Sequence, residues 1–290
     1  MPPILYFFAL CNLVIGSGAF VLGGILQPVS VSLGISLAAA GQAMTAYAVA
    51  TAILAPLLII LTIKWPSKRV IQLALALFTG GCVVSALAPN FSTLLLGRVL
   101  MGGGAMFTAA AAALTVSMVP PALRGRALSI TFLGMSVSYA VGVPLGAWLG
   151  FEYGWRVPVW LSAAVSLAAL LSVGWLVPAN LAGGGSSFVG FKAVAVNPAV
   201  LRVWLRTLLY FVAVFSVFAY IGPVLQALNP MSSGGLSLTL AAFGLSGVVG
   251  TLVGGWANDR FGSLRTLVGQ LSVMISMMAL LPLTQGHLSL

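Results

Sequence analysis

Apolar residues fill this chain in long, nearly continuous runs that are broken at short intervals by glycine, proline and charged residues. A helix needs about 20 such residues to cross the hydrocarbon core of a bilayer, and in lipid its backbone groups must bond internally. The runs do not alternate between apolar and polar positions as barrel strands do. The pattern predicts nine spanning helices, antiparallel to their neighbours, near residues 4–28, 39–63, 69–88, 92–118, 125–150, 156–177, 200–226, 235–257 and 264–283.

Composition supports a membrane environment. Hydrophobic residues make up 61% of the 290 positions and charged residues 5%, whereas a soluble domain has about 25% charged residues. The net charge of +10 comes from 12 basic residues set against two acidic ones, Glu152 and Asp259. In a soluble chain this charge would suggest nucleic acid, but here nearly all the cations lie in or near the breaks between apolar runs. No nucleic-acid partner is expected.

The basic residues predict an orientation in the membrane. Those that follow the second, fourth, sixth and eighth runs are Lys64, Lys68, Arg69, Arg124, Arg126, Lys192, Arg202, Arg206, Arg260 and Arg265. The opposite set of loops contains only Arg156, accompanied by Glu152. Basic loops stay in the cytoplasm, so these loops and the amino terminus are predicted to be cytoplasmic. We interpret the first run as a spanning helix because it is too long for a secretory signal.

The longest polar interruption suggests two parts. It contains the flexible stretch 183–187, Gly-Gly-Gly-Ser-Ser, and separates six runs from three. We expect an N-terminal six-helix bundle at 1–178, a cytoplasmic linker at 179–199 and a partial C-terminal bundle of about three helices at 200–290. A second half that mirrored the first would need six helices.

Arg98 is the electrostatic outlier, because it lies inside the apolar fourth run. An arginine within a membrane helix costs at least about 2.5 kcal/mol on insertion scales, so it is expected to face a water-filled cavity or a polar partner. The alternative is that its side chain reaches the outer interface, since Pro89 and Asn90 are only about two turns away.

Small residues and one proline inside the runs predict close packing and a bend. Gly102, Gly134, Gly142 and Gly146 would let neighbouring helices approach each other, although any one glycine can be explained by packing alone. Pro144 removes a backbone N–H from the fifth run and predicts a kink there.

Polar side chains within the runs are candidates for lining a solute path, although many such groups bond to backbone carbonyls instead. The candidates are Asn12, Gln42, Thr45, Tyr47, Tyr139 and Tyr220.

Groups that enzyme chemistry needs are lacking in the sequence. No carboxylate lies in the middle of a run, and the chain has a single histidine, His287, near its carboxyl end. There is no phosphate-binding loop, no HExxH and no Ser/His/Asp set. Two isolated cysteines, Cys11 and Cys82, indicate neither a disulfide framework nor a metal site. We expect no enzyme, no cofactor and no metal.

Several stretches, in order, resemble motifs of the major facilitator superfamily, in particular its bacterial drug/proton antiporter and sugar-efflux branch. They are the second-run segments 45–48 and 55–58, the Arg-Gly cluster 97–105, the loop 119–127, the fifth-run segment 134–146, the turn 154–156 and the loop 255–265. The resemblance covers nearly the whole chain.

The resemblance implies a polytopic all-α bundle of two pseudo-symmetric six-helix halves in a bacterial inner membrane, with a solute site between the halves and rocking that exposes it to each side. It implies that Arg98 acts near the cavity and that residues 142–144 bend the fifth helix. The loop motif includes Gly255, Asp259, Arg260, Gly262 and Arg265, and its Asp259–Arg260 pair would act as a cytoplasmic latch.

The chain departs from the family pattern at two places. Residues 59–69 contain no acidic residue where relatives repeat the glycine-aspartate-arginine signature, and Ala19 stands where many relatives have a glutamate before Phe20.

We therefore expect a secondary transporter that exports a small drug-like or sugar-like solute by proton antiport, with membrane lipid as its surroundings. The alternative is a truncated or degenerate carrier without transport activity, and a membrane enzyme ranks below both. The sequence indicates no oligomeric state.

Overall fold

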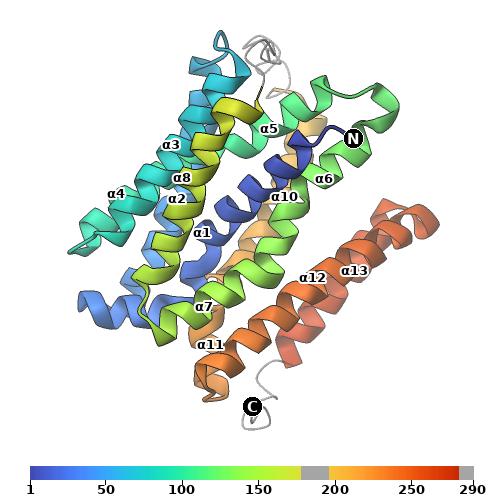
Figure 1. The fold of residues 1–290 in the computed structure, drawn as a ribbon. Helices are drawn as coiled ribbons and strands as arrows, with labels where there is room; N and C mark the ends of the chain where they lie inside the picture. Colours follow the sequence, from blue (N-terminus) through green and yellow to red (C-terminus); the bar gives the residue numbers. More distant parts are fainter. Residues whose placement is uncertain (178–195, 281–290) are drawn as a thin grey trace.

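The computed structural model describes residues 1–177 and 196–280, and within these ranges the side chains of residues 122, 251, 252, 255, 256, 258, 259 and 263 are left undescribed. The described part consists of helices and contains no strand (Figure 1). The helices are α1 (Ile4–Leu33), α2 (Leu37–Leu61), α3 (Ser67–Ala86), α4 (Phe91–Gly104), α5 (Met106–Ser117), η1 (Pro121–Leu123), α6 (Arg124–Val137), η2 (Ser138–Gly142), α7 (Val143–Glu152), α8 (Arg156–Leu176), α10 (Pro198–Phe218), α11 (Ile221–Leu228), α12 (Ser233–Phe261) and α13 (Ser263–Leu280).

These helices confirm the predicted all-α membrane fold. Within the described ranges, eight helical segments are long and apolar enough to cross a membrane, and a shorter apolar helix follows at Leu264–Leu280. The fourth predicted span is α4 and α5, the fifth is α6, η2 and α7, and the seventh is α10 and α11. The predicted linker 179–199 and the last residues of the ninth span lie mostly or wholly outside the described residues.

Local sequence explains where several helices begin and end. The side chains of Ser36 and Asn90 accept hydrogen bonds from the backbone N–H groups of Ala39 and Thr93, at 3.1 and 3.0 Å, which caps the first turns of α2 and α4. Gly34 ends α1 with a φ of 63°, a left-handed conformation that glycine adopts without a steric penalty.

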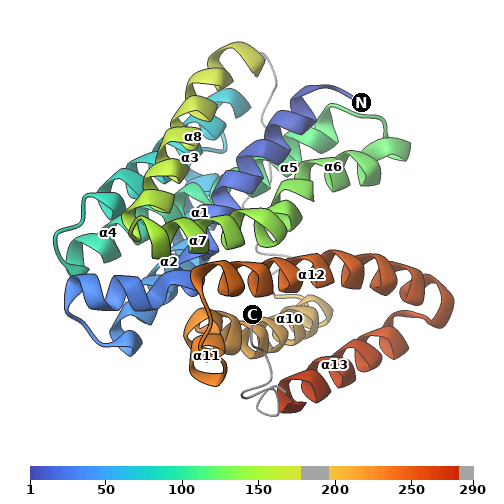
Figure 2. The ribbon, with the colours of Figure 1, turned by 60° about the horizontal axis from the view of Figure 1, so that its bottom comes forward.

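The helices form two groups. Helices α1 to α8 pack on one another, chiefly through α2 and α3 on α4, α3 on α8 and α1 on α6 and α7. Helices α10 to α13 lie beside this bundle, with α11 against α1 and α12 against η2 and α7 (Figures 1 and 2).

Glycines allow α4 to pack tightly between α2 and α3. A Cβ at Gly104 would lie 2.7 Å from the backbone nitrogen of Phe78 in α3, and one at Gly102 would lie 2.8 Å from the carbonyl oxygen of Tyr47 in α2. Lipid tails are as apolar as the helices, so helices associate in membranes through such close contacts rather than through hydrophobic burial. The glycine cluster of the fourth span is therefore a packing surface.

The fifth span packs along α1 in a regular register. Gly134 faces the backbone of Ala9 and Leu13, Gly142 faces Ser17, and Gly146 faces Val21. Residue numbers rise together along the two segments in these contacts, so α1 and the fifth span run parallel. The small residues predicted to bring helices together therefore join these two spans.

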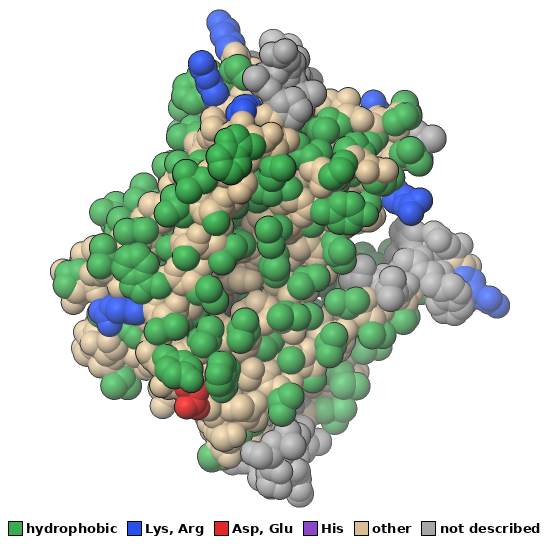
Figure 3. Space-filling model, viewed as in Figure 1, with side chains coloured by type: hydrophobic (Ala, Val, Ile, Leu, Met, Phe, Trp, Pro, Cys, Tyr) green, Lys and Arg blue, Asp and Glu red, His purple; other side chains and the backbone are tan. Residues whose placement is uncertain are grey.

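Most charged side chains collect at one end of the molecule, which we call the basic end. The α2–α3 and α5–α6 connections, the start of α10 and the α12–α13 turn all lie there, and Figure 3 shows lysine and arginine side chains toward the upper and right edges of the face. Arg156 lies at the opposite end, where its guanidinium donates a 2.8 Å hydrogen bond to the carbonyl of Ala88. On the face shown in Figure 3, apolar side chains are spread over the surface between the two ends.

Two adjacent glycines in α3 test the packing argument. A Cβ at Gly81 would lie 2.6 Å from the carbonyl oxygen of Gly97 and from the backbone nitrogen of Met101, whereas a Cβ at Gly80 would meet nothing within 4 Å. We expect Gly81→Ala to lower the thermal midpoint of the detergent-solubilised protein, because overpacking costs about 1–3 kcal/mol. The matched Gly80→Ala should leave the midpoint unchanged or raise it, since alanine favours a helix by up to roughly 1 kcal/mol. Equal effects of the two substitutions would contradict tight packing of α3 on α4.

Candidate functional site

The two groups of helices meet along a seam of small residues. A Cβ at Gly222 of α11 would lie 2.6 Å from the carbonyl oxygen of Gly24 in α1. That carbonyl lacks its usual partner, because Pro28, four residues on, has no N–H to donate. Ile25 leaves the helical conformation at this point, with φ −124° and ψ 23°. The kink thus lies where α11 packs on the Gly24 carbonyl, which Pro28 deprives of its usual helical donor.

The seam continues along α12. Gly244 lies directly against the backbone of Tyr139 and Ala140 in the π-helix η2. Ser237 donates a 2.9 Å hydrogen bond to the carbonyl of Pro144, and Ser233 donates one to the Glu152 carboxylate. These contacts connect the first half of α12 to the second half of the fifth span.

Along α12, contact with the first group becomes sparse beyond Gly244. None of the α12 residues 245–250 is buried, and α12 makes few contacts with α6 compared with those it makes with η2 and α7. Helix α12 runs from the end opposite the basic end toward the basic end, as Figure 2 also shows. The seam is therefore closed at the end opposite the basic end, and the two groups separate toward the basic end.

Arg98 is buried beside this seam and is 2% exposed. Its Nη1 and Nη2 donate hydrogen bonds of 2.9 and 2.6 Å to the carbonyls of Gly18 and Ala19 in α1, and its Nε donates one of 3.3 Å to Ala43 in α2. The guanidinium also lies 5.0 Å from the ring centroid of Tyr47. Arg98 thus has polar partners, as one of the two sequence hypotheses expected, and its side chain does not reach the outer interface.

The partners of Arg98 are neutral. Of the two acidic residues, Glu152 lies at the end of α7, and Asp259 lies two residues before the end of α12, where its side chain is not described. The charge of Arg98 is stabilised by backbone dipoles, by the Tyr47 ring and by the 3.6 Å contact of its Nη1 with the Met101 sulfur. Arg98 therefore joins three helices, because each of its three guanidinium nitrogens donates to a backbone carbonyl of α1 or α2.

The other polar candidates fall into three environments. Asn12 is fully buried and joins α6 and α5, since its amide donates 2.9 Å to the carbonyl of Thr131 and accepts 2.9 Å from the hydroxyl of Thr108. Gln42 and Thr45 are exposed on α2, and Tyr220 lies against Gly41 within the seam. These residues form one set in the sequence because all are polar side chains within apolar runs, but they lie on different helix faces.

The fifth span is interrupted where a kink was expected. Residues Ser138–Gly142 form a π-helix, and Pro144 lies in the first turn of the α-helix that follows. Proline cannot donate to the carbonyl four residues earlier, and a π-bulge is a common way to absorb such a break. The break exposes the backbone at Tyr139, on which Gly244 packs.

The structure describes the side chains of only some residues of the predicted latch motif. Gly255 and Asp259 belong to the described backbone of α12, but their side-chain surroundings are not described. Gly262 ends the helix with a φ of 81°, and Arg260 and Arg265 are exposed on either side of it. The latch stays a prediction.

A group of aromatic rings lies where the two helix groups meet. We call Tyr139, Phe20, Phe215 and Phe211, taken in this spatial order, the aromatic ladder. Successive centroids are 5.2, 5.5 and 5.9 Å apart, and successive planes differ by 31°, 24° and 27°. The phenylalanines of α10 are not among the candidates predicted from the sequence, although positions 211, 215 and 218 follow the spacing of one helix face.

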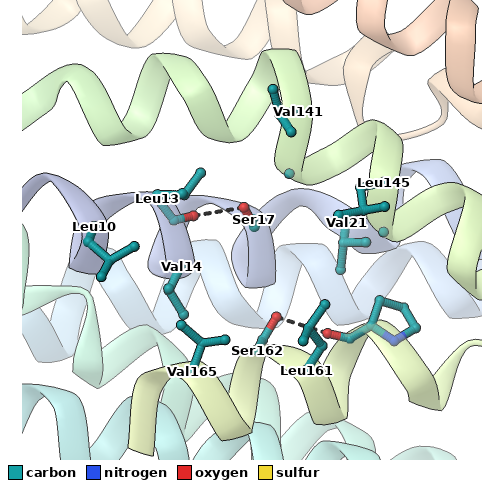
Figure 4. A pocket seen from close by; sticks show the side chains of 13 residues that line it. Leu10, Leu13, Val14, Ser17, Val21, Val141, Leu145, Leu161, Ser162 and Val165 are labelled. Carbon is teal, nitrogen blue, oxygen red and sulfur yellow. Dashed lines mark hydrogen bonds between the residues drawn. The ribbon is translucent and has the colours of Figure 1, made fainter. Parts of the chain in front are cut away.

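Two hollows lie outside the seam. One of about 190 Å³ lies between α1, η2, α7 and α8, and Figure 4 shows its wall of leucine and valine side chains. Its hydroxyls, Ser17 and Ser162, bond to carbonyls of their own helices, those of Leu13 and Pro158. The other, of about 220 Å³, lies at the basic end between α2, α3 and α5. Neither hollow touches both helix groups, so neither is our candidate solute site.

Replacing Arg98 by lysine tests its structural role. Lysine keeps the charge, but its ammonium group lacks the planar set of N–H donors with which the guanidinium reaches three carbonyls on two helices. We expect Arg98→Lys to lower the stability of the solubilised protein by roughly 1.5–3 kcal/mol for each hydrogen bond lost, measured by thermal or denaturant unfolding. Arg206→Lys, on an exposed position of α10, is the matched control and should have no measurable effect. An Arg98→Lys protein as stable as the parent would show that charge alone suffices.

Comparisons with known proteins agree with this architecture. The family model described as Major Facilitator Superfamily matches residues 8–289. The chain is 30% identical over 279 residues to the inner membrane transport protein YdhP of Escherichia coli strain K12, covering 93% of this chain and 71% of that protein. It is 35% identical over 235 residues to the purine ribonucleoside efflux pump NepI of Shigella sonnei, covering 78% of this chain and 58% of that protein.

Solved structures show the same fold. A bacterial homologue of the human lysosomal transporter Spinster, in an inward-facing and unoccupied conformation, superposes with a TM-score of 0.75 at 18% identity. The match covers 89% of this chain and 62% of that one, so this chain spans less than two thirds of that protein's length. Together with the buried arginine, the glycine-packed helices and the seam, these matches show that the chain is an integral membrane protein that belongs to the major facilitator superfamily of transporters.

Proposed function

We propose that this chain is an efflux carrier, which exports a small drug-like or sugar-like solute from the cytoplasm by proton antiport. The solute site lies between the two helix groups, and transport alternates between a state open at the basic end and a state open at the opposite end. The basic end and the amino terminus are cytoplasmic, in accord with the bias of lysine and arginine. The state described above is then open to the cytoplasm.

The seam is the observation that supports alternating access. The close contacts between the groups are made mainly by glycines and backbone carbonyls. Gly222 packs on the carbonyl of Gly24, and Gly244 packs on the carbonyl of Tyr139. The hydrogen bonds across it involve serine hydroxyls, at Ser233 and Ser237. Such contacts can part without leaving a buried charge unpaired, whereas the bonds of Arg98 within the first group cannot.

Relatives support the direction of transport. A chloramphenicol resistance protein of Streptomyces lividans is 29% identical over 265 residues, covering 90% of this chain and 68% of that protein. The names of this protein and of the NepI pump describe drug resistance and efflux. Export of a small organic molecule is the function these relatives favour for this chain.

Transport in vesicles tests the proposal. In inside-out vesicles that contain the purified chain, an imposed proton gradient should drive uptake of at least one solute from a panel of drugs, nucleosides and sugars. An ionophore that collapses the gradient should abolish the uptake. Arg98→Ala and Asp259→Asn should reduce it, because the first disconnects α1 from α4 and the second removes the acid of the predicted latch.

The alternative is a carrier fold without transport activity, favoured by the missing acidic residue in the segment 59–69. If no solute in the panel moves with or without the gradient, while the protein remains folded in the vesicles, the alternative replaces the proposal.

Cross-linking the seam provides a second test of alternating access. In a background with Cys11 and Cys82 replaced by alanine, cysteines at Glu152 and Ser233 would be joined by a short thiol cross-linker that reduction cleaves. The link should stop transport, and reduction should restore it, because these positions must separate when the opposite end opens. Each single cysteine, treated alike, is the control and should keep its activity. Full transport by the cross-linked protein would show that the seam does not open.

A further inference from the structure

We propose that the solute contains an uncharged planar aromatic ring, which binds by inserting between Phe20 of α1 and Phe215 of α10 in the aromatic ladder. This inference rests on the proposed function and adds the chemical class of its solute. It follows from the ring geometry, from the position of the ladder between the helix groups and from the distribution of charge.

The ladder already has the geometry of a stack. Tyr139, Phe20, Phe215 and Phe211 have neighbouring planes within about 31° of one another, and their centroid separations of 5.2–5.9 Å are those of offset-stacked rings. A planar ring inserted between Phe20 and Phe215 would continue this stack on both of its faces. An aliphatic ring or a sugar ring has no π-system and could not stack on the two phenylalanine rings.

The contact between Phe20 and Phe215 is the one at which the ladder crosses from one helix group to the other. Tyr139 and Phe20 belong to the first group, and Phe215 and Phe211 belong to the second. Relative motion of the groups changes this separation while it leaves the other two contacts of the ladder intact. A ring bound there would therefore touch both groups at once, as a carrier needs in order to couple binding to movement.

One side of the ladder is closed and the other side is accessible. Phe218 is 6% exposed and lies nearly perpendicular to Phe20, Tyr139 and Phe215, at 71°, 75° and 88°, on the side of the seam. Phe211 lies one turn of α10 toward the basic end from Phe215 and is 49% exposed. Phe218 thus forms a floor, and a solute would approach from the basic end.

A hydrogen-bonding group lies beside the floor. Tyr139 is half-buried, and within the described part of the chain its hydroxyl makes no hydrogen bond. The hydroxyl can therefore donate to, or accept from, a ring substituent of a bound solute. This adds a directional contact to a site that otherwise offers π-surfaces.

The charges of the chain favour a neutral ring. The chain has two acidic residues, and neither lies at the depth of the ladder: Glu152 is at the end of the fifth span and Asp259 is two residues before the end of α12. The nearby cation, Arg98, donates to carbonyls of Gly18, Ala19 and Ala43. A cationic solute would find no carboxylate here, and an anionic solute would find a guanidinium whose bonds to α1 and α2 are already made.

The test compares ligands that differ by a ring. Inosine and ribose share a sugar and differ in the neutral heteroaromatic base, and ethidium is a cationic aromatic. Binding of each to the purified full chain is measured by equilibrium dialysis. We expect inosine to bind, ribose to bind at least tenfold more weakly and ethidium not to compete with inosine.

Variants of the ladder locate the site. Phe215→Leu should weaken inosine binding about tenfold, a loss typical of removing one ring from a stack with a base. Phe215→Trp keeps a ring and should retain binding, which separates loss of stacking from loss of folding. Trp175→Leu removes a 91% exposed ring at the end of α8 and should change nothing. Tyr139→Phe should weaken inosine binding less than Phe215→Leu does.

Each other outcome contradicts the inference in a recognisable way. Equal binding of ribose and inosine, preferred binding of ethidium, or unchanged inosine binding by Phe215→Leu would overturn it. If inosine does not bind while the vesicle panel shows gradient-driven export of a non-aromatic solute, the solute class is wrong and the proposed function stands. If no solute of the panel is exported either, the proposed function fails with it.

Discussion

The bonds of Arg98 to backbone carbonyls are the interaction on which the first helix group depends. A guanidinium in the membrane must have its donors satisfied, and here two helices supply the acceptors at Gly18, Ala19 and Ala43. Because carbonyls project from fixed positions on a helix, these bonds set the rotation and depth of α1 and α2 relative to α4. Phe20 follows Ala19 directly, so the same bonds place its ring at the seam.

Two kinds of helix contact divide the molecule into parts that hold together and a surface that can open. Inside the first group, side-chain hydrogen bonds such as Asn12 with Thr131 and Thr79 with Ser166 reinforce close glycine packing. Across the seam, the close contacts are mainly between a glycine and a backbone carbonyl, as between Gly222 and the carbonyl of Gly24. Breaking the side-chain hydrogen bonds within the first group leaves buried polar groups unpaired. Separating the glycine–carbonyl contacts across the seam loses mainly van der Waals contact. The rocking of the two groups proposed above would use this difference in cost.

The sequence predicted the helices well because a single physical quantity, the length of an apolar run, determines them. For Arg98 it left a water-filled cavity, a polar partner and the outer interface open, since backbone carbonyls at Gly18 and Ala19 leave no mark in residue identity. Asn12 was grouped with cavity residues because hydropathy does not say which face of a helix a residue occupies. The aromatic ladder was missed because its rings come from three segments distant in sequence, and only the spacing of Phe211, Phe215 and Phe218 hinted at it. The latch at Asp259 and the cytoplasmic linker stay predictions.

The direction in which the seam opens is the central claim, and labelling of α12 tests it most directly. In a background with Cys11 and Cys82 replaced by alanine, a cysteine at Val248, one turn beyond Gly244, and one at Leu240, 2% exposed within the seam, would be treated with a membrane-impermeant maleimide. Val248→Cys should react from the cytoplasmic side, in inside-out vesicles, and Leu240→Cys should be protected from both sides. Reaction of Leu240→Cys from the outside, with Val248→Cys protected from the inside, would contradict the account.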